Sequence, residues 1–360
     1  MPGDMIAMVA CGHTLGGVHN SDFPEITGDT TADEVHMFEK GNSNANFDNA
    51  VVTEYLDGST VNLLVTGSNE TTNSDGRIFQ ADGNATMKAM AEPEAFQSRC
   101  ADILERMIDT VPSTVELTEV QPIEVKPYIE ELALTTNGTL HFEGRIRVRI
   151  TGDFEDDRTV HLTYADRSGA NASQTIEARR ATLKGGTSSG LFRELFAWHE
   201  FAVDLDADAG VSKFHVHLTS PSTGAVEVRD NGGPGFPLDD SVLYQKAQSC
   251  ATGPTGDGGS TMDLTVTAAV RKDRADEPVN LDLAHVVARP GIMLPAFDVR
   301  RTAFEKTDAE KAGYVLFEAH TPFTLTTTRN TFDIVLGEGD ARSSVEFQNT
   351  GPLTDKCEAL

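Results

Sequence analysis

The hydrophobic period of this chain changes near residue 112, and that change constrains its fold more than any other feature. Over residues 92–111 apolar side chains recur every three or four positions, which predicts a helix. Residues 145–150 instead read Arg-Ile-Arg-Val-Arg-Ile, the strict alternation of a half-exposed strand. The same alternation returns over 214–218 and 262–270. We therefore expect an α+β multidomain chain that is helical first and β-rich afterwards.

The pattern divides the chain into three candidate domains. Residues 1–112 are expected to be all-α, with a long loop over 19–46, a helix starting near Asp48 and a short element around Asp75. Residues 113–238 and 239–360 are expected to form one or two β-sandwich domains, because turn-rich clusters separate the short strands. Residues 189–199, which hold the only tryptophan, are expected to be a helix that covers a sheet edge.

Composition excludes two classes of function. The formal net charge of −27 over 360 residues argues against a nucleic-acid partner, because phosphate binding requires a basic surface. No run of eighteen apolar residues occurs, so no membrane span is expected. A solvated acidic surface is the simplest explanation of the charge.

Cysteines and glycosylation sequons point to a secreted protein. The Asn-x-Ser/Thr pattern occurs at Asn69, Asn84, Asn137 and Asn171. The four cysteines are too few for a disulfide scaffold and too widely spaced for a zinc site. Pairing of Cys11 with Cys100 and of Cys250 with Cys357 would place one bridge in each region, but other pairings satisfy the sequence equally well.

The most informative motif is a histidine at the end of the first helical segment. Residues 4–17 read Asp-Met-Ile-Ala-Met-Val-Ala-Cys-Gly-His-Thr-Leu-Gly-Gly, followed in order by Phe-Asp-Asn at 47–49 and Ser-Asp at 74–75. This order resembles the proximal half of the plant, fungal and bacterial haem peroxidase superfamily, in particular its secreted fungal members. The resemblance covers residues 1–112 and rests on three motifs in the family's order.

The resemblance implies a haem b cofactor held by His13. The imidazole would be the axial ligand of the iron, and Asp75 would accept the other ring N–H and so increase the donor strength of His13. The implied activity is oxidation of a small organic or phenolic donor by hydrogen peroxide. The absence of tryptophan before Trp198 excludes a proximal tryptophan radical within residues 1–112.

The resemblance also implies supporting sites. His19 matches a position that contacts a haem propionate in some members, although an exposed loop histidine explains it equally well. Thr14 and Asp48 match positions that hold a structural cation in relatives. Ligation by oxygen alone suits calcium or potassium. Further oxygen donors could come from Gly41, Ser43 and Asn46.

One part of the family pattern is missing. The distal histidine and arginine, which cleave the peroxide bond, stand as Arg-x-x-x-His in relatives, and no arginine here is followed four residues later by a histidine. The chain also begins without a signal peptide. We therefore expect a fragment of a larger gene product that lacks the distal half and is inactive alone.

Two motifs in the β-rich region are alternatives for a metal. His215 and His217 share one face of a strand, but two ligands do not make a site, and a polar sheet face is the simpler explanation. Residues 204–210 resemble a calcium loop whose glycine is displaced by one position, which favours an acidic turn.

The sequence also supports a second function from another class. The chain could be a non-enzymatic extracellular or cell-wall protein, in which the β domains contact polysaccharide and the helical remnant is vestigial. The share of the chain given to strands favours this alternative, whereas the ordered match of His13, Asp48 and Asp75 favours the peroxidase.

Overall fold

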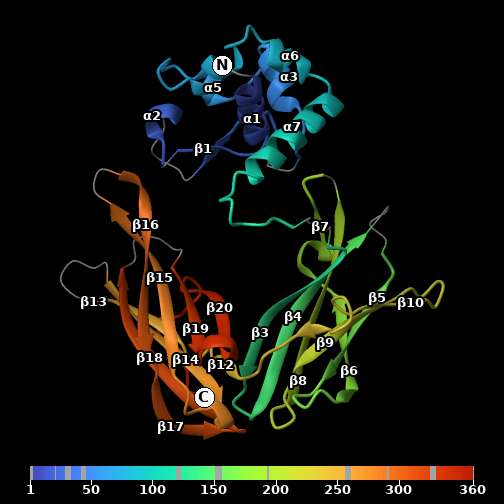
Figure 1. Ribbon diagram of the computed structural model, residues 1–360, viewed down its shortest axis with the longest axis vertical. Helices are drawn as coiled ribbons and strands as arrows, with labels where there is room; N and C mark the ends of the chain where they lie inside the picture. Colours follow the sequence, from blue (N-terminus) through green and yellow to red (C-terminus); the bar gives the residue numbers. More distant parts are fainter. Residues whose placement is uncertain are drawn as a thin grey trace. The chain divides into compact units, whose positions relative to one another are not determined.

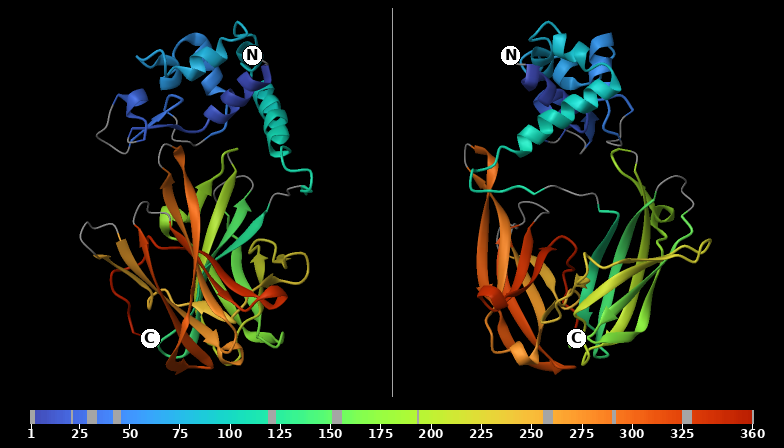
Figure 2. Two further views of the ribbon diagram at one scale, coloured as in Figure 1. Left: turned by 60° about the vertical axis from the view of Figure 1, so that its left-hand side comes forward. Right: turned by 45° about the vertical axis from the view of Figure 1, so that its right-hand side comes forward.

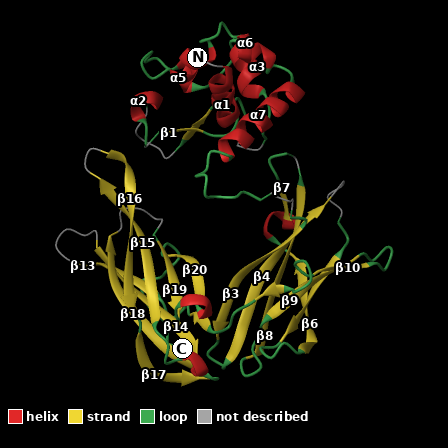
Figure 3. Cartoon of the chain, in the orientation of Figure 1, coloured by secondary structure: helices red, strands yellow, loops and turns green. Residues whose placement is uncertain are grey.

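The chain divides into two compact units in the computed structural model. The helical unit comprises residues 1–123, 149–154 and 187–196, and the β unit comprises 124–148, 155–186 and 197–360. A helical region is thus followed by antiparallel β-sheets, as the change of period predicts (Figure 3). The structure describes residues 3–20, 22–28, 34–41, 46–118, 123–150, 156–192, 194–255, 261–289, 292–324 and 330–359.

Helix α1 lies at the centre of the helical unit (Figure 1). It contacts four other helices and buries Ile6, Ala7 and Ala10 among them. The short helices are consistent with the many Gly, Asn and Asp residues between them, which favour turns. The bounds are α1 Gly3–His13, α3 Ala50–Asp57, α5 Ser74–Phe79, α6 Ala85–Ala89 and α7 Pro93–Ile108.

A disulfide fixes the position of α1 against α7. Cys11 and Cys100 are both buried and form a bridge, which confirms the first expected pairing. At the other end of α1, Asp4 accepts a hydrogen bond from Arg106 (3.0 Å) and also pairs with Arg99. The histidine at the end of α1 therefore stands on a helix held at both ends.

The segment expected as a loop over 19–46 contains regular structure. Strands β1 (Gly17–His19) and β2 (Val35–Met37) pair as a small antiparallel sheet, and α2 (Pro24–Thr27) lies between them. A Cβ at Gly17 would collide with the backbone carbonyl of His36, so only glycine permits this approach. Helix α4 (Leu63–Thr66) completes the unit.

The first sheet has nine antiparallel strands, and all of them except β7 and the ends of β4 and β8 belong to the β unit. The order along its main path is β10-β9-β5-β6-β8-β4-β3, with β11 paired to β9 and β7 paired to β8. In Figure 2 the strands drawn in green and yellow-green lie side by side in one curved layer. The bounds are β3 Val125–Leu134, β4 Thr139–Ile150, β5 Thr159–Ala165, β6 Asn171–Arg180, β7 Thr187–Ser189, β8 Leu195–Asp206, β9 Lys213–Thr219, β10 Val226–Arg229 and β11 Phe236–Pro237.

The helix expected over residues 189–199 was a wrong prediction. Strand β7 ends at Ser189 and strand β8 begins at Leu195. In β8 the buried side chains of Ala197, His199 and Phe201 alternate with the partly exposed Trp198 and Glu200. Strand β6 pairs directly with β8. Cross-strand pairing therefore decides the conformation, because local propensity is weaker than packing between neighbouring strands.

Two smaller antiparallel sheets share a second core. Alternate side chains of β14 and β15, such as Val266 and Leu281, point into one common apolar cluster with Phe317 and Phe332. The sheet orders are β12-β14-β18-β17, with β13 paired to β14, and β16-β15-β19-β20. The bounds are β12 Val242–Tyr244, β13 Cys250–Thr255, β14 Thr261–Arg271, β15 Val279–Arg289, β16 Ile292–Ala303, β17 Glu305–Lys311, β18 Tyr314–Thr324, β19 Thr331–Leu336 and β20 Ser343–Asn349.

A buried ion cluster joins the nine-stranded sheet to the second core. Asp240, which is 2% exposed, accepts hydrogen bonds from Arg167 (2.8 Å) and from Arg271 (3.0 Å). The backbone N–H of Val211 donates to the same carboxylate (3.2 Å), and the Tyr314 hydroxyl donates to the Asp240 carbonyl (3.1 Å). Each polar group of the cluster is therefore compensated within the β unit.

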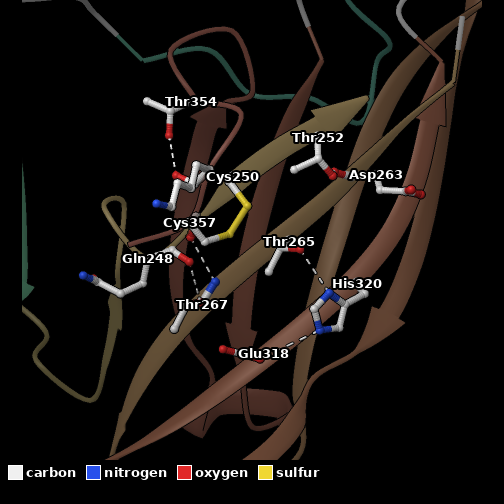
Figure 4. Close-up of a disulfide and its surroundings, with 12 residues drawn as sticks. Gln248, Cys250, Thr252, Asp263, Thr265, Thr267, Glu318, His320, Thr354 and Cys357 are labelled. Carbon is white, nitrogen blue, oxygen red and sulfur yellow. Dashed lines mark hydrogen bonds and ion pairs between the residues drawn. A yellow bond between two sulfur atoms is a disulfide. The ribbon is translucent and has the colours of Figure 1, made fainter. Parts of the chain in front are cut away.

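The second disulfide ties the C-terminal segment to β13. Cys250 bonds to Cys357, which confirms the second expected pairing (Figure 4). Next to the bridge, the backbone N–H of Ala251 donates to the carbonyl of Thr354 (2.9 Å). On the adjacent strands Thr265 and His320 are hydrogen-bonded at 3.0 Å, as Figure 4 also shows.

Candidate functional site

The structure brings together His13 and Asp75, which lie 62 residues apart in the sequence. His13 ends α1, and Asp75 stands in the first turn of α5. The Nδ1 atom of His13 lies 2.6 Å from Oδ2 of Asp75. A hydrogen bond to a carboxylate places the proton on Nδ1, so the lone pair of a neutral imidazole is on Nε2. This is the tautomer that a metal ligand requires.

Two further side chains orient Asp75. Its side chain is 1% exposed, and Oδ2 also accepts a hydrogen bond from the Asn62 amide (2.8 Å). The Ser74 hydroxyl donates to Oδ1 (3.3 Å). The side-chain oxygen Oδ1 of Asn62 caps α4 by accepting a hydrogen bond from the backbone N–H of Leu64 (2.8 Å). The side-chain amide of Asn62 therefore has little rotational freedom. Asn62 was not predicted, although an Asn before an apolar helical turn is a recognisable cap signal.

Phe38 fixes the plane of the His13 ring. The two rings are stacked, with centroids 4.4 Å apart and an interplanar angle of 17°. Phe38 is buried and follows β2, and its backbone N–H donates to the carbonyl of Gly16 (3.1 Å). Because the small sheet positions this phenylalanine, its role depends on a contact between residues 25 positions apart. No local sequence signal reveals such a contact.

The two residues expected at a cation site are also adjacent. The Thr14 hydroxyl donates to the backbone carbonyl of Asp48 and lies 3.0 Å from Oε1 of Glu39. Glu39 is 3% exposed and accepts a hydrogen bond from the backbone N–H of Val51 (2.9 Å). Asp48 itself accepts from the N–H of Ala50 (2.9 Å) at the start of α3. Sequence reasoning missed Glu39, the buried carboxylate of this group.

The other residues of the helical unit that were predicted as possible ligands are His19, Gly41, Ser43 and Asn46. His19 stands at the end of β1 with its side chain exposed. Gly41 and Asn46 are described, whereas Ser43 lies outside the described residues. Of the sequons, Asn69, Asn137 and Asn171 are exposed.

The fourth sequon has a different environment. The Asn84 side chain is partly buried and accepts a hydrogen bond from the Tyr55 hydroxyl (2.9 Å). This sequon is therefore the least suited to carry a glycan.

The residues present fit a haem. His13 has Nδ1 committed to a buried carboxylate, and 30% of its side chain remains exposed, which leaves Nε2 as the nitrogen that can bind iron. The stacked Phe38 and the buried Asp75 restrict rotation of the ring. A preset tautomer and a preset orientation are the properties of an axial imidazole ligand.

The histidines of the β unit do not form a comparable site. The rings of His217 and His161 stack with centroids 4.7 Å apart, and His217 Nε2 bonds to the Thr163 hydroxyl (2.9 Å). Among the described residues, no three His, Cys, Asp or Glu side chains are placed to hold a metal ion.

The candidate calcium loop is occupied by internal contacts. The carboxylate of Asp204 pairs with Nδ1 of His141 (2.8 Å). Asp206 accepts a hydrogen bond from the backbone N–H of Asp208 (2.9 Å). The carboxylate of Asp204 therefore binds a side chain on the sheet surface, and that of Asp206 stabilises the turn.

No protein-family profile matches the chain. Over 98% of its length it is 31% identical to a WSC domain-containing protein from the fungus Arthroderma benhamiae. The chain spans 46% of that relative, about half its length.

The comparison and the disulfides bear on localisation. Two disulfides and a fungal relative indicate an extracellular protein. In the part of the chain that the structure describes, no helix combines the length and apolarity needed to cross a bilayer.

Proposed function

We propose that the helical unit is the proximal half of a secreted fungal haem peroxidase domain, and that His13 binds the iron of haem b. The observation that carries the proposal is the 2.6 Å hydrogen bond between Nδ1 of His13 and buried Asp75. The two residues lie 62 positions apart in the sequence and meet in the fold, and an axial ligand with a carboxylate partner would require this contact.

The bound haem would supply electron transfer between hydrogen peroxide and a small organic donor. This chain's contribution is to hold and tune the axial nitrogen. Asp75 keeps the proton on Nδ1 and gives the imidazole anionic character, while Phe38 limits rotation of the ring. We assign no peroxide-cleaving residue to this chain, because it contains no Arg-x-x-x-His sequence. Calcium or potassium at Thr14, Glu39 and Asp48 would stiffen the segment after His13.

A haemin titration of the purified chain tests the proposal. We expect saturable binding with a histidine-ligated Soret band that His13→Ala abolishes. His320→Ala is the matched control, because His320 is exposed in the β unit. Haemin binding that His13→Ala leaves intact, or no specific binding, would contradict the assignment.

We infer a second candidate function for the β unit, that of a non-enzymatic binding module for extracellular polysaccharide. The fungal relative is named for a WSC domain, which favours this candidate. The sheets around the second core would then form the sandwich-like domain that the sequence suggests.

Co-sedimentation with insoluble fungal cell-wall polysaccharides tests this candidate. We expect the full chain to be depleted from solution, and His13→Ala to be depleted equally. A chain that stays in the supernatant with every polysaccharide would exclude the binding module.

A further inference from the structure

A cavity of about 330 Å³ lies within the β unit, between β3, β12 and β20. Residues 129–132 of β3 form one wall, and Asp239 and β12 form another. The third is formed by Val345, Gln348 and Asn349 of β20. Strand β12 contacts both β3 and β20, and the labels of the three strands lie close together in Figure 1. The volume is at the lower end of the range for small-molecule sites, ~300–1,000 Å³.

The walls of this cavity are held in place from outside it. In the orientation that satisfies both its ends, the Gln245 amide donates to the Leu134 carbonyl (3.0 Å) and accepts from the Leu134 N–H (3.1 Å). This pair of bonds joins the end of β12 to β3. Asp239 directly precedes Asp240, the centre of the buried ion cluster. A cavity between fixed walls is preorganised, so little ordering opposes binding.

Both long walls deviate from regular strand geometry at the cavity. The pairing of β3 with β4 shifts register between Ile129 and Glu131. The pairing of β20 with β19 shifts opposite residues 345–348, where Phe347 has a φ of 57° and is 80% exposed. A bulky residue in this left-handed region is an outlier. Bulges of this kind redirect side chains and often lie next to functional sites.

The lining disfavours an anionic ligand. The carboxylates of Glu130, Glu131 and Asp239 line the cavity together with one ammonium group, that of Lys246. Of these carboxylates, Glu130 is paired with Arg145 (3.3 Å) and Asp239 accepts a hydrogen bond from the backbone N–H of Ser241 (2.9 Å). The net negative charge repels phosphate, sulfate and uronate groups. Glu131 is half-buried and makes no ion pair among the described residues, so its carboxylate can accept hydrogen bonds from a ligand.

The other lining groups suit a ligand rich in hydroxyls. Gln348 and Asn349 carry amides that can both donate and accept. Burial raises the pKa of Tyr244 to about 12, and its hydroxyl, which has Ser249 as a hydrogen-bond partner, can both donate and accept. Between these polar groups lie the apolar side chains of Ile129 and Leu132, which can cover the C–H face of a ring.

We propose that this cavity binds a sugar residue of a neutral polysaccharide. Glu131 and Asp239 would accept hydrogen bonds from neighbouring sugar hydroxyls, and the β20 amides would bind the opposite edge of the ring. The inference rests on the second candidate function and deepens it by naming the subsite and the ligand class.

Calorimetric titration of the full chain with laminarihexaose, chitohexaose and mannohexaose tests the proposal. We expect at least one of them to bind, and Glu131→Gln to weaken that binding about tenfold, the effect of one charge-assisted hydrogen bond. Glu305→Gln makes the same chemical change on exposed β17 and should leave affinity unaltered. Tyr244→Phe, which keeps the ring and removes the hydroxyl, should weaken binding severalfold, and thermal unfolding checks that each variant is folded.

The outcomes separate this proposal from the function on which it rests. Co-sedimentation with polysaccharide that is unchanged in folded Glu131→Gln and Tyr244→Phe would overturn the cavity site and leave the binding module standing. Tighter binding of hexalysine than of any oligosaccharide would also overturn it, in favour of a cationic ligand. Absence of all polysaccharide binding would remove both proposals together.

Discussion

The helical unit and the β unit each bury an aspartate, and the two carboxylates have opposite consequences. Asp75 is 1% exposed and Asp240 is 2% exposed. Asp75 orients a histidine whose second nitrogen has no hydrogen-bond partner among the described residues. Asp240 binds two arginines that have further partners of their own: Arg271 pairs with Asp273, and Arg167 donates to the Ala207 carbonyl. Both units thus bury a carboxylate, and they differ in what its partners do.

The difference shows which buried charges belong to a binding site. A carboxylate whose partners are saturated stabilises the fold, as Asp240 does. In the proposed haem site, a carboxylate whose partner keeps a second ligand atom would prepare that atom to bind a metal, as Asp75 would for His13. A buried ion pair therefore indicates a binding site when one of its members keeps a ligand atom without a partner.

Asp240→Asn is expected to have the largest effect on stability. Removing the negative charge takes away the buried carboxylate that two partly buried guanidinium groups share, which costs about 3–5 kcal/mol for a buried pair. Urea unfolding followed by the fluorescence of Trp198 in the β unit would measure it. Asp75→Asn, the same change in the helical unit, should leave that transition nearly unchanged. Equal shifts of the unfolding transition in the two variants would contradict the difference between Asp240 and Asp75.

Removing each disulfide is expected to destabilise its own region by about 2–5 kcal/mol, because the bridges close long loops of 89 and 107 residues. The double replacement Cys11→Ala/Cys100→Ala should also weaken haemin binding, since Cys11 lies two residues before His13. Cys250→Ala/Cys357→Ala should not. Calorimetric melting and a haemin titration of both variants would show whether the ligand site depends on its local bridge alone.

Asp75→Asn is expected to weaken haemin binding about 10- to 100-fold, or ~1.4–2.7 kcal/mol, because an amide partner orients the ring less strongly and gives it no anionic character. Asp240→Asn, measured in a concentration of urea where it remains folded, should bind haemin like the unaltered chain. A Soret titration distinguishes the two. Normal affinity in Asp75→Asn would contradict the role of this carboxylate.

Acid is expected to destabilise the β unit through His199. This residue is 3% exposed, and its burial, aided by the charge of Arg180, lowers its pKa to about 4. An unfolded histidine has a pKa near ~6.5, so below that pH the unfolded state binds a proton that the folded state does not. Stability should therefore fall by up to ~1.4 kcal/mol per pH unit between pH ~6.5 and ~4.

His199→Gln provides the control for this pH dependence. Denaturation midpoints across the pH range should fall less steeply in this variant than in the unaltered chain. Parallel pH profiles would show that other groups cause the acid sensitivity.

The sequence predicted those parts of the fold that depend on local pattern. The helix over 92–111 is α7, the element around Asp75 is α5, and the alternation at 145–150 lies in β4. The pairing of β1 with β2 could not be predicted, because His36 and Val18 meet only through the close approach at Gly17. Strand β8 was missed because its conformation depends on its neighbours.

Only the residues of the candidate site that belong to a sequence motif could be predicted. His13 and Asp75 follow from the resemblance, and the structure supplies their hydrogen bond. Phe38, Glu39 and Asn62 carry no motif, and their roles arise from contacts across 25, 25 and 13 residues. The cavity between β3 and β20 joins segments more than 200 residues apart, beyond any pattern in one sequence.

The position of the first bridge has a consequence for the maturation of the protein. Cys11 is one helical half-turn from His13, and its bond to Cys100 clamps the ligand-bearing helix onto the last helix of its unit. In a reducing cytosol this bond does not persist. If His13 binds haem as proposed, assembly of the haem site would follow oxidation in the secretory pathway, so newly made chains would carry no haem before export begins.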